Sequence, residues 1–124
     1  MTFTDLEKVA IIKAAELIAN ADHDENFLEG LIAFTQASVW GIGEEDIDKY
    51  DEMDDEMEYH EMVKILSKLD TKQKKYASGF WAAIVIADDE KEDSEIAVWE
   101  VLHTMCGIPQ TDLEKAAKYW ESQN

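Results

Sequence analysis

Apolar residues recur at helical spacing along almost the whole chain, and this pattern limits the fold more than any other feature of the sequence. One stripe comprises Leu6, Ala10, Ala14, Leu17, Ile18 and Ala21, and a second comprises Phe27, Leu28, Leu31, Ile32, Thr35 and Val39. Similar stripes follow between residues 57 and 69, 76 and 87, and 96 and 106. No segment shows the sustained period-two alternation of a half-buried strand. The sequence therefore predicts an all-α fold of about seven helices.

Several helix ends carry local signals of their own. The segments Thr4–Glu7 and Thr111–Glu114 have the spacing of a capping box, in which the first and fourth residues satisfy each other's backbone groups. Gly41 and Gly107 each follow an apolar stripe and are expected to end a helix in the left-handed conformation. A short helix is expected from Glu44 to about Tyr50, between the first of these stops and an acidic stretch.

The two halves of the sequence are related by a shift of 66 positions, without a gap. The shift superimposes Lys8/Lys74, Ile18/Ile84, Ala21/Ala87, Asp22/Asp88, Glu29/Glu95, Gly41/Gly107, Ile42/Ile108, Asp46/Asp112 and Lys49/Lys115. The repeat predicts one domain, residues 1–124, made of two pseudo-duplicated halves at about 4–50 and 70–116, with 51–69 as a bridge. Because neither half can bury its apolar faces alone, we expect the halves to pack about an approximate two-fold axis.

Each half also carries an acidic turn between its first two helices. Hard cations such as Ca²⁺ and Mg²⁺ prefer carboxylate and amide oxygens. A carboxylate at the carboxyl end of a helix opposes the macrodipole, so a bound cation would stabilise it there. The candidate metal ligands are Asp22, Asp24, Asn26 and Glu29 in the first half and Asp88, Glu90, Glu92 and Glu95 in the second.

Helix capping is the alternative explanation for these acids. Asn26 and Glu29 have the offset of a capping box, which accounts for Glu29 without a metal ion, whereas Glu92 is a poor N-cap and leaves Glu95 less well explained. An EF-hand is rejected, because Phe27 and Ala33 occupy the loop positions where that motif needs Gly and Glu.

The charge balance restricts the partners of the chain. There are 29 Asp and Glu against 11 basic residues, all of them Lys, which gives a formal net charge of −18. Such a field repels the phosphates of nucleic acid and favours cations or basic protein partners. One alternative function follows from the acidic run Asp51–Glu61: a decoy that mimics nucleic acid and occupies a basic protein.

No catalytic motif stands out, so we expect a protein that is not an enzyme. The sequence lacks a nucleophile elbow, a phosphate-binding loop and a dinucleotide fingerprint. His103 and Cys106 lie three apart, but their apolar stripe favours a buried, inert thiol. A hydrolase with paired carboxylates is the third hypothesis, and no pattern places one of the many acids in an apolar pocket.

The remaining features point to a cytoplasmic protein. Cys106 is the single cysteine, so no internal disulfide can form, which suits a reducing compartment. The N-terminal residues do not have the pattern of a signal peptide. No apolar run approaches the length of a membrane span.

Taken together, the repeated motifs resemble the TerB-like family, named for tellurite-resistance proteins. The family pattern, Ala-Asp-Gly followed by an acidic spacer, a Glu and a Gly-hydrophobic step, corresponds to 21–42 and 87–108, with His23 and Asp89 in place of the Gly. The resemblance implies an all-helical stress-response or accessory protein without established catalytic activity. It also implies a divalent-cation site at the acidic turns and protein partners, often at the inner face of the membrane, which this chain would reach by peripheral association.

Overall fold

Seven α-helices and one short 3-10 helix make up the described part of the chain, which contains no strand. The computed structural model describes residues 1–21, 27–87 and 93–124, and the side chains of residues 27–29 lie outside that description. The elements are α1 (Asp5–Ala19), α2 (Phe27–Val39), η1 (Glu44–Asp46), α3 (Ile47–Glu56), α4 (Tyr59–Ser67), α5 (Thr71–Ala87), α6 (Asp93–Cys106) and α7 (Leu113–Gln123). The predicted all-α fold is confirmed.

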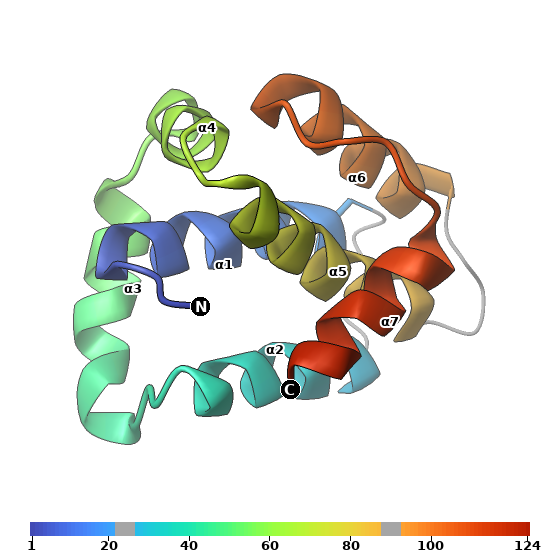
Figure 1. Cartoon of the computed structure of the whole chain (residues 1–124). Coiled ribbons are helices and arrows are strands. Elements are labelled where there is room, and N and C mark those ends of the chain that lie inside the picture. Colours follow the sequence, from blue (N-terminus) through green and yellow to red (C-terminus); the bar gives the residue numbers. More distant parts are fainter. Residues whose placement is uncertain (22–26, 88–92) are drawn as a thin grey trace.

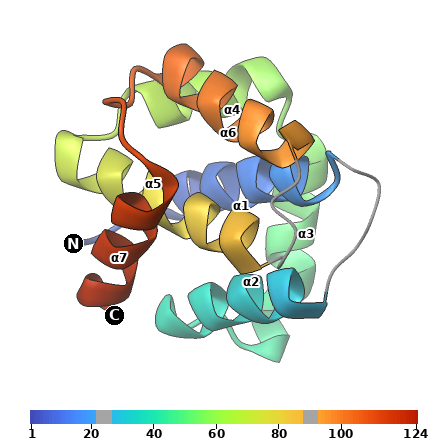
Figure 2. The same ribbon diagram turned by 90° about the vertical axis from the view of Figure 1, so that its right-hand side faces the viewer.

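Helices α1 and α5 occupy the centre of the molecule, and the other helices surround them (Figure 1). Helices α4 and α6 lie on one side of this central pair and α2 lies on the opposite side, as the perpendicular view confirms (Figure 2). Helix α3 flanks α1, and α7 packs closely against α5. None of the helices within the described ranges has both the length and the apolar character needed to cross a bilayer.

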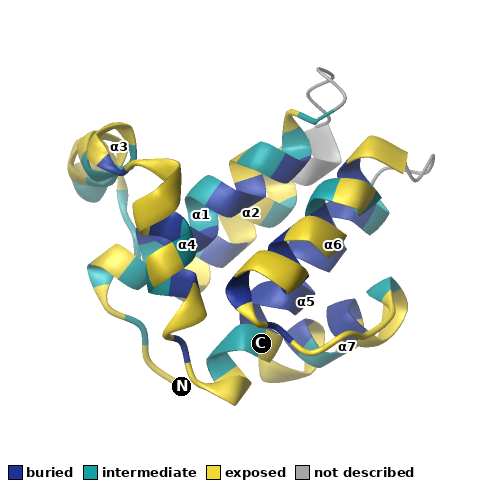
Figure 3. Ribbon diagram, turned by 90° about the horizontal axis from the view of Figure 1, so that it is seen from above, coloured by how far each residue is buried: buried dark blue, intermediate teal, exposed yellow. Residues whose placement is uncertain are grey.

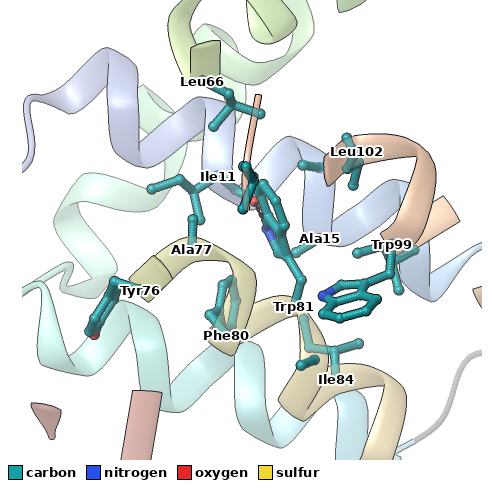
Figure 4. Packing of buried hydrophobic residues seen from close by; sticks show 14 of the residues in the cluster. Ile11, Ala15, Leu66, Tyr76, Ala77, Phe80, Trp81, Ile84, Trp99 and Leu102 are labelled. Carbon is teal, nitrogen blue, oxygen red and sulfur yellow. Dashed lines mark hydrogen bonds between the residues drawn. The ribbon is translucent and has the colours of Figure 1, made fainter. Parts of the chain in front are cut away.

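The core is centred on α5, whose segment 76–85 is buried on every side. A helix that is buried all round needs partners on all its faces, and α1, α2, α6 and α7 supply them. The indole of Trp81 is completely buried and donates a hydrogen bond to the carbonyl of Ile11, 3.0 Å away, which joins α5 to α1 (Figure 4). The Trp99 indole donates to the carbonyl of Ser78, at 3.1 Å, and joins α6 to α5. Exposed residues lie along the outer faces of α4 and α6 (Figure 3).

The helix ends agree with the sequence signals in all but one case. Thr4 and Glu7 form the expected capping box at the start of α1. Gly41 and Gly107 adopt positive φ angles of 73° and 66°, as expected for left-handed helix stops. The second capping box was wrong: the N-cap of α7 is Asp112, whose carboxylate accepts from the amide of Lys115. The helix therefore begins one residue later than a Thr111 cap requires.

The short helix expected at 44–50 is longer than the sequence indicated. A single 3-10 turn, η1, leads directly into α3, which continues to Glu56. The acidic run Asp51–Glu61 is consequently divided between α3 and the start of α4. Continuous helix is favoured here because Lys13 of α1 forms an ion pair with Asp54, which holds α3 alongside α1.

The order of elements repeats with the same 66-residue shift as the sequence. The first residues of three helices, Asp5, Phe27 and Ile47, are followed 66 positions later by the first residues Thr71, Asp93 and Leu113. The two positive-φ glycines have the same separation. Packing of the halves about a two-fold axis stays a prediction.

Helix α2 points a different face toward the core from the one that the sequence predicted. Three of its apolar residues are largely exposed: Phe34 by 69%, Val39 by 50% and Leu31 by 49%. Among the described side chains of α2, the fully buried one is polar: Gln36 donates to the hydroxyl of Tyr76 at 3.0 Å and accepts from the indole of Trp120 at 2.6 Å. These two hydrogen bonds fix the inward face of α2, so the stripe through Leu31, Thr35 and Val39 was wrong as a core face. In α1, Leu6 is likewise exposed instead of buried.

Candidate functional site

A cavity of about 420 Å³ lies between α1 and α2, above the core helix α5. Its walls are mainly small and apolar. The lining residues are Ile12, Ala15, Glu16, Ala19 and Asn20 of α1, Gly30, Ala33 and Ala37 of α2, and Phe80 and Ile84 of α5. A site with an apolar lining and a few polar groups at its rim is typical of ligand-binding pockets.

The cavity exists because the facing surfaces of α1 and α2 are made of short side chains. Gly30, Ala33 and Ala37 recur at helical spacing, so they lie on one face of α2. That helix packs mainly on α5 and only lightly on α1. On its core side, α2 is held by the hydrogen bonds of Gln36 to Tyr76 and Trp120.

A second, smaller depression of about 140 Å³ continues the cavity toward α3. Both are lined by Ile12, Glu16 and Ala37, so they form one channel, which we call the α1–α2 groove. The remaining residues of the second part are Val9, Ile42, Ile47, Tyr50, Asp51 and Asp54. The groove is therefore apolar along most of its length and acidic at the end next to α3.

Two carboxyl groups and one ammonium group meet at this acidic end. The Nζ atom of Lys13 lies 2.9 Å from the Oδ1 atom of Asp54 and 2.9 Å from the carbonyl oxygen of the same residue. The hydrogen bond to Asp54 raises the pKa of Lys13. Loss of solvent around its carboxyl, together with a hydrogen bond to Asp54, raises the pKa of Glu16 to about 8, although part of the residue is exposed. This shift favours the protonated form of Glu16, which can donate to Asp54.

Glycoside hydrolases also use a pair of carboxyl groups. Both the retaining and the inverting mechanism require carboxyl groups about 5–9.5 Å apart, with the substrate or a water molecule between them. Glu16 and Asp54 instead share a direct hydrogen bond.

Exposed apolar side chains continue the groove onto the surface of α2. Phe34 follows the lining residue Ala33 and lies one helical turn from Ala37, which places it beside the groove. Leu31, which lies about one helical turn before Phe34, is also exposed. Contiguous exposed apolar surface of this kind marks interaction sites.

The metal ligands predicted from sequence fall mostly outside the described residues. Six of them, Asp22, Asp24, Asn26, Asp88, Glu90 and Glu92, lie in 22–26 and 88–92, and the side chain of Glu29 is not described either. Glu95 is described and is completely buried in the first turn of α6. Among the residues whose positions are given, no three His, Cys, Asp or Glu side chains gather closely enough to hold a metal ion.

The pair His103 and Cys106 does not form a catalytic dyad. The Nδ1 atom of His103 lies 2.6 Å from the carbonyl oxygen of Trp99, which can only accept, so Nδ1 carries the proton. The Nε2 atom then accepts from the hydroxyl of Ser78 at 2.7 Å, and burial lowers the pKa of His103. Burial also raises the pKa of Cys106 to about 11. The expectation of a buried thiol is confirmed.

Comparisons with known proteins agree with the fold and leave the function open. No family model matches the chain, and no curated protein matches it significantly. A crystal structure of a protein of unknown function from Porphyromonas gingivalis is similar to it, with a TM-score of 0.83 and 28% sequence identity. The alignment covers 97% of this chain and 98% of that protein. The TerB-like resemblance stays a prediction.

Sequence reasoning missed the α1–α2 groove, although two signals for it are present. Lys13 and Glu16 interrupt the apolar run of α1, and charges at such positions must lie at an edge of the core or meet partners. On α2, Gly30, Ala33 and Ala37 place three small residues on one face. The partner Asp54 could not be paired with Lys13 from sequence alone, because 41 residues separate them.

Proposed function

We propose that this chain is a non-enzymatic, TerB-like accessory protein of the cytoplasm, and that it acts by binding a basic amphipathic helix of a protein partner in the α1–α2 groove. The observation that carries the proposal is the groove itself: an apolar channel between α1 and α2 that ends at the acids Glu16, Asp51 and Asp54. Protein partners also follow from the TerB-like resemblance of the repeated motifs.

The size and lining of the groove suit a helix better than a small polar molecule. Helix-in-groove recognition places the apolar face of an amphipathic helix against small and apolar side chains, with anchors spaced three or four residues apart. Ala15, Ala19, Ala33 and Ala37 offer short walls on both sides, and Phe80 forms part of the floor. Phe34 adds apolar contact area beside the channel.

The negative charge around the groove favours a partner that is positively charged. Next to its acidic end, α3 exposes five carboxylates to solvent, on Asp48, Asp51, Glu52, Asp55 and Glu56. The whole chain carries a net charge of −18. Complementary charge speeds association and excludes partners of like charge, so the bound helix should carry Lys or Arg beside its apolar face.

A synthetic peptide of leucine and lysine, arranged so that a helix has one apolar and one basic face, tests the proposal by fluorescence anisotropy. Ala33 is exposed and lines the groove, so Ala33→Glu should preserve the fold while placing a charge in the apolar channel. We expect Ala33→Glu to weaken binding by about tenfold or more, because burying an unpaired carboxylate is costly. Thr35→Glu, on the outer side of the same helix, adds the same charge and should leave the affinity close to that of the wild type.

A scrambled peptide of the same composition separates this proposal from the decoy alternative. The acidic run Asp51–Glu61 is mostly exposed on α3 and the start of α4, as a nucleic-acid mimic would require. A decoy would bind the scrambled peptide as well as the amphipathic one and would be equally affected by Ala33→Glu and Thr35→Glu. Such a result would contradict recognition through the groove.

The two acidic turns remain the proposed place for a divalent cation. Support comes from the residue types of the turns, because Asp, Asn and Glu supply the oxygen ligands that hard cations prefer. Titration with Ca²⁺ and Mg²⁺ should raise the thermal unfolding temperature, and Asp22→Ala and Asp88→Ala should each reduce the increase. Unfolding curves that both cations leave unchanged in all three proteins would remove the cation site.

A further inference from the structure

A cavity of about 550 Å³ lies on the other side of the molecule from the groove's acidic end, between α5, the α6–α7 connection and α7. It is lined by Lys75, Ser78, Ile108, Pro109, Gln110, Thr111, Lys115, Ala116, Lys118, Tyr119 and Ser122. Its three charged residues are all lysines, in a chain with 29 acidic and 11 basic residues. The cavity therefore has a local charge opposite to that of the whole protein.

The positions of these lysines follow from the helices that carry them. Lys115 and Lys118 lie one turn apart on α7, so they face the same side of that helix. Lys75 of α5 approaches from the opposite wall, and its Nζ atom lies 4.5 Å from the centre of the Tyr119 ring. This cation–π contact holds the ammonium group of Lys75 over the aromatic wall of the cavity.

The acidic group next to Lys115, the carboxylate of Asp112, already interacts with that lysine. One carboxylate oxygen of Asp112 caps the amide of Lys115 at 2.8 Å, and the other lies 3.8 Å from the Nζ atom of the same lysine. Charges farther from the cavity than the Debye length of about 8 Å at physiological salt are largely screened. An anion inside the cavity is thus governed by the three lysines more than by the net charge.

We propose that this cavity binds a small organic phosphate, meaning a phosphate monoester with an apolar or aromatic body. Lysine ammonium groups bind phosphate as point charges. The hydroxyl group of Thr111 can donate a hydrogen bond to its oxygens, and the walls formed by Ile108, Pro109 and Tyr119 accept the apolar part. The site is independent of the α1–α2 groove, which shares no residue with it.

Isothermal titration calorimetry with adenosine monophosphate, inorganic phosphate and adenosine tests the proposal at about 0.1 M salt. We expect adenosine monophosphate to bind more tightly than inorganic phosphate, and adenosine alone to give no measurable heat. Lys115→Gln and Lys118→Gln should each weaken adenosine monophosphate binding by about threefold to fivefold, as expected for an exposed charge pair.

Lys64→Gln serves as the matched control, because Lys64 is an exposed lysine on α4 that does not line the cavity. It should leave the affinity unchanged. Equal losses in Lys64→Gln and Lys118→Gln would indicate diffuse attraction and overturn the proposal, as would the absence of adenosine monophosphate binding. A polyglutamate peptide that binds while the nucleotide does not would instead assign the lysines to an acidic protein partner.

Discussion

Lys13, Glu16 and Asp54 give the α1–α2 groove its chemical character. In the second half of the sequence, 66 residues later, the same positions hold Gly79, Ala82 and Trp120. There α5 and α7 pack tightly through apolar contacts. In the first half an ion pair and a carboxyl pair replace those contacts, so α1 and α3 meet through polar groups at the end of an open channel.

The raised pKa of Glu16 predicts how stability depends on pH. The folded protein keeps this proton up to about pH 8, whereas the unfolded chain loses it near the ordinary pKa of 4.5. Between these values the folded state binds more protons than the unfolded state, so the contribution of Glu16 to stability falls as the pH rises. Glu16→Gln keeps a hydrogen-bond donor for Asp54 without this titration.

Thermal unfolding of both proteins at about pH 5 and about pH 9 checks this prediction. We expect Glu16→Gln to gain stability relative to the wild type as the pH increases. A constant difference between the two melting temperatures over this range would contradict a raised Glu16 pKa.

At the residue scale, local signals were predictable and long-range partners were not. The Thr4 cap and the glycine stops at Gly41 and Gly107 follow from short-range backbone chemistry, and they are confirmed. The contact of Gln36 with Tyr76 and Trp120 joins residues 40 and 84 positions apart, which no periodicity reveals. That contact turns α2 and exposes Phe34, so the candidate groove depends on tertiary packing.

At the scale of single helices, α5 and α2 each contain a glycine, but only the one in α5 is needed for close packing. A Cβ atom added at Gly79 would clash with the carbonyl oxygen of Ala116 and would lie 2.7 Å from the Cβ atom of Trp120. Glycine is therefore required for the close approach of α7 to α5. A Cβ atom at Gly30 of α2 would meet no atom within 4 Å.

The same substitution should consequently have opposite effects in the two helices. Gly79→Ala should destabilise the protein by about 1–3 kcal/mol, because the α5–α7 contact must open. Gly30→Ala should stabilise it by about 0.5–1 kcal/mol through its higher helix propensity. Urea unfolding midpoints of the two variants measure both effects, and a loss of stability in Gly30→Ala would show that α2 is packed more tightly than we describe.

The helices themselves were largely predictable, since each carries apolar residues at helical spacing. The errors occurred where that pattern does not decide the outcome. In α3, charged residues outnumber apolar ones and the helix was expected to end near Tyr50, but the Lys13–Asp54 ion pair accompanies a helix that reaches Glu56. Helix α2 has more apolar side chains than the core buries, so several of them lie at the surface.

At the scale of the whole molecule, acids and lysines are distributed unevenly among the described residues. Exposed acids are concentrated on α3 and the start of α4, next to the acidic end of the α1–α2 groove. Lysines are concentrated at the start of α5 and on α7, around the second cavity. A net charge of −18 does not by itself indicate such a division, because composition carries no information on position. We propose that the acidic surface binds a basic partner and that the lysine-lined cavity binds an anionic ligand.

Backbone amide chemical shifts of the protein, recorded with and without the leucine–lysine peptide, test the central claim most directly. We predict that the largest changes map to the α1–α2 groove, at residues such as Ala15, Ala19, Ala33 and Ala37, and that they disappear in Ala33→Glu. Changes confined to the acidic surface of α3, persisting in Ala33→Glu, would contradict the account and leave only electrostatic attraction.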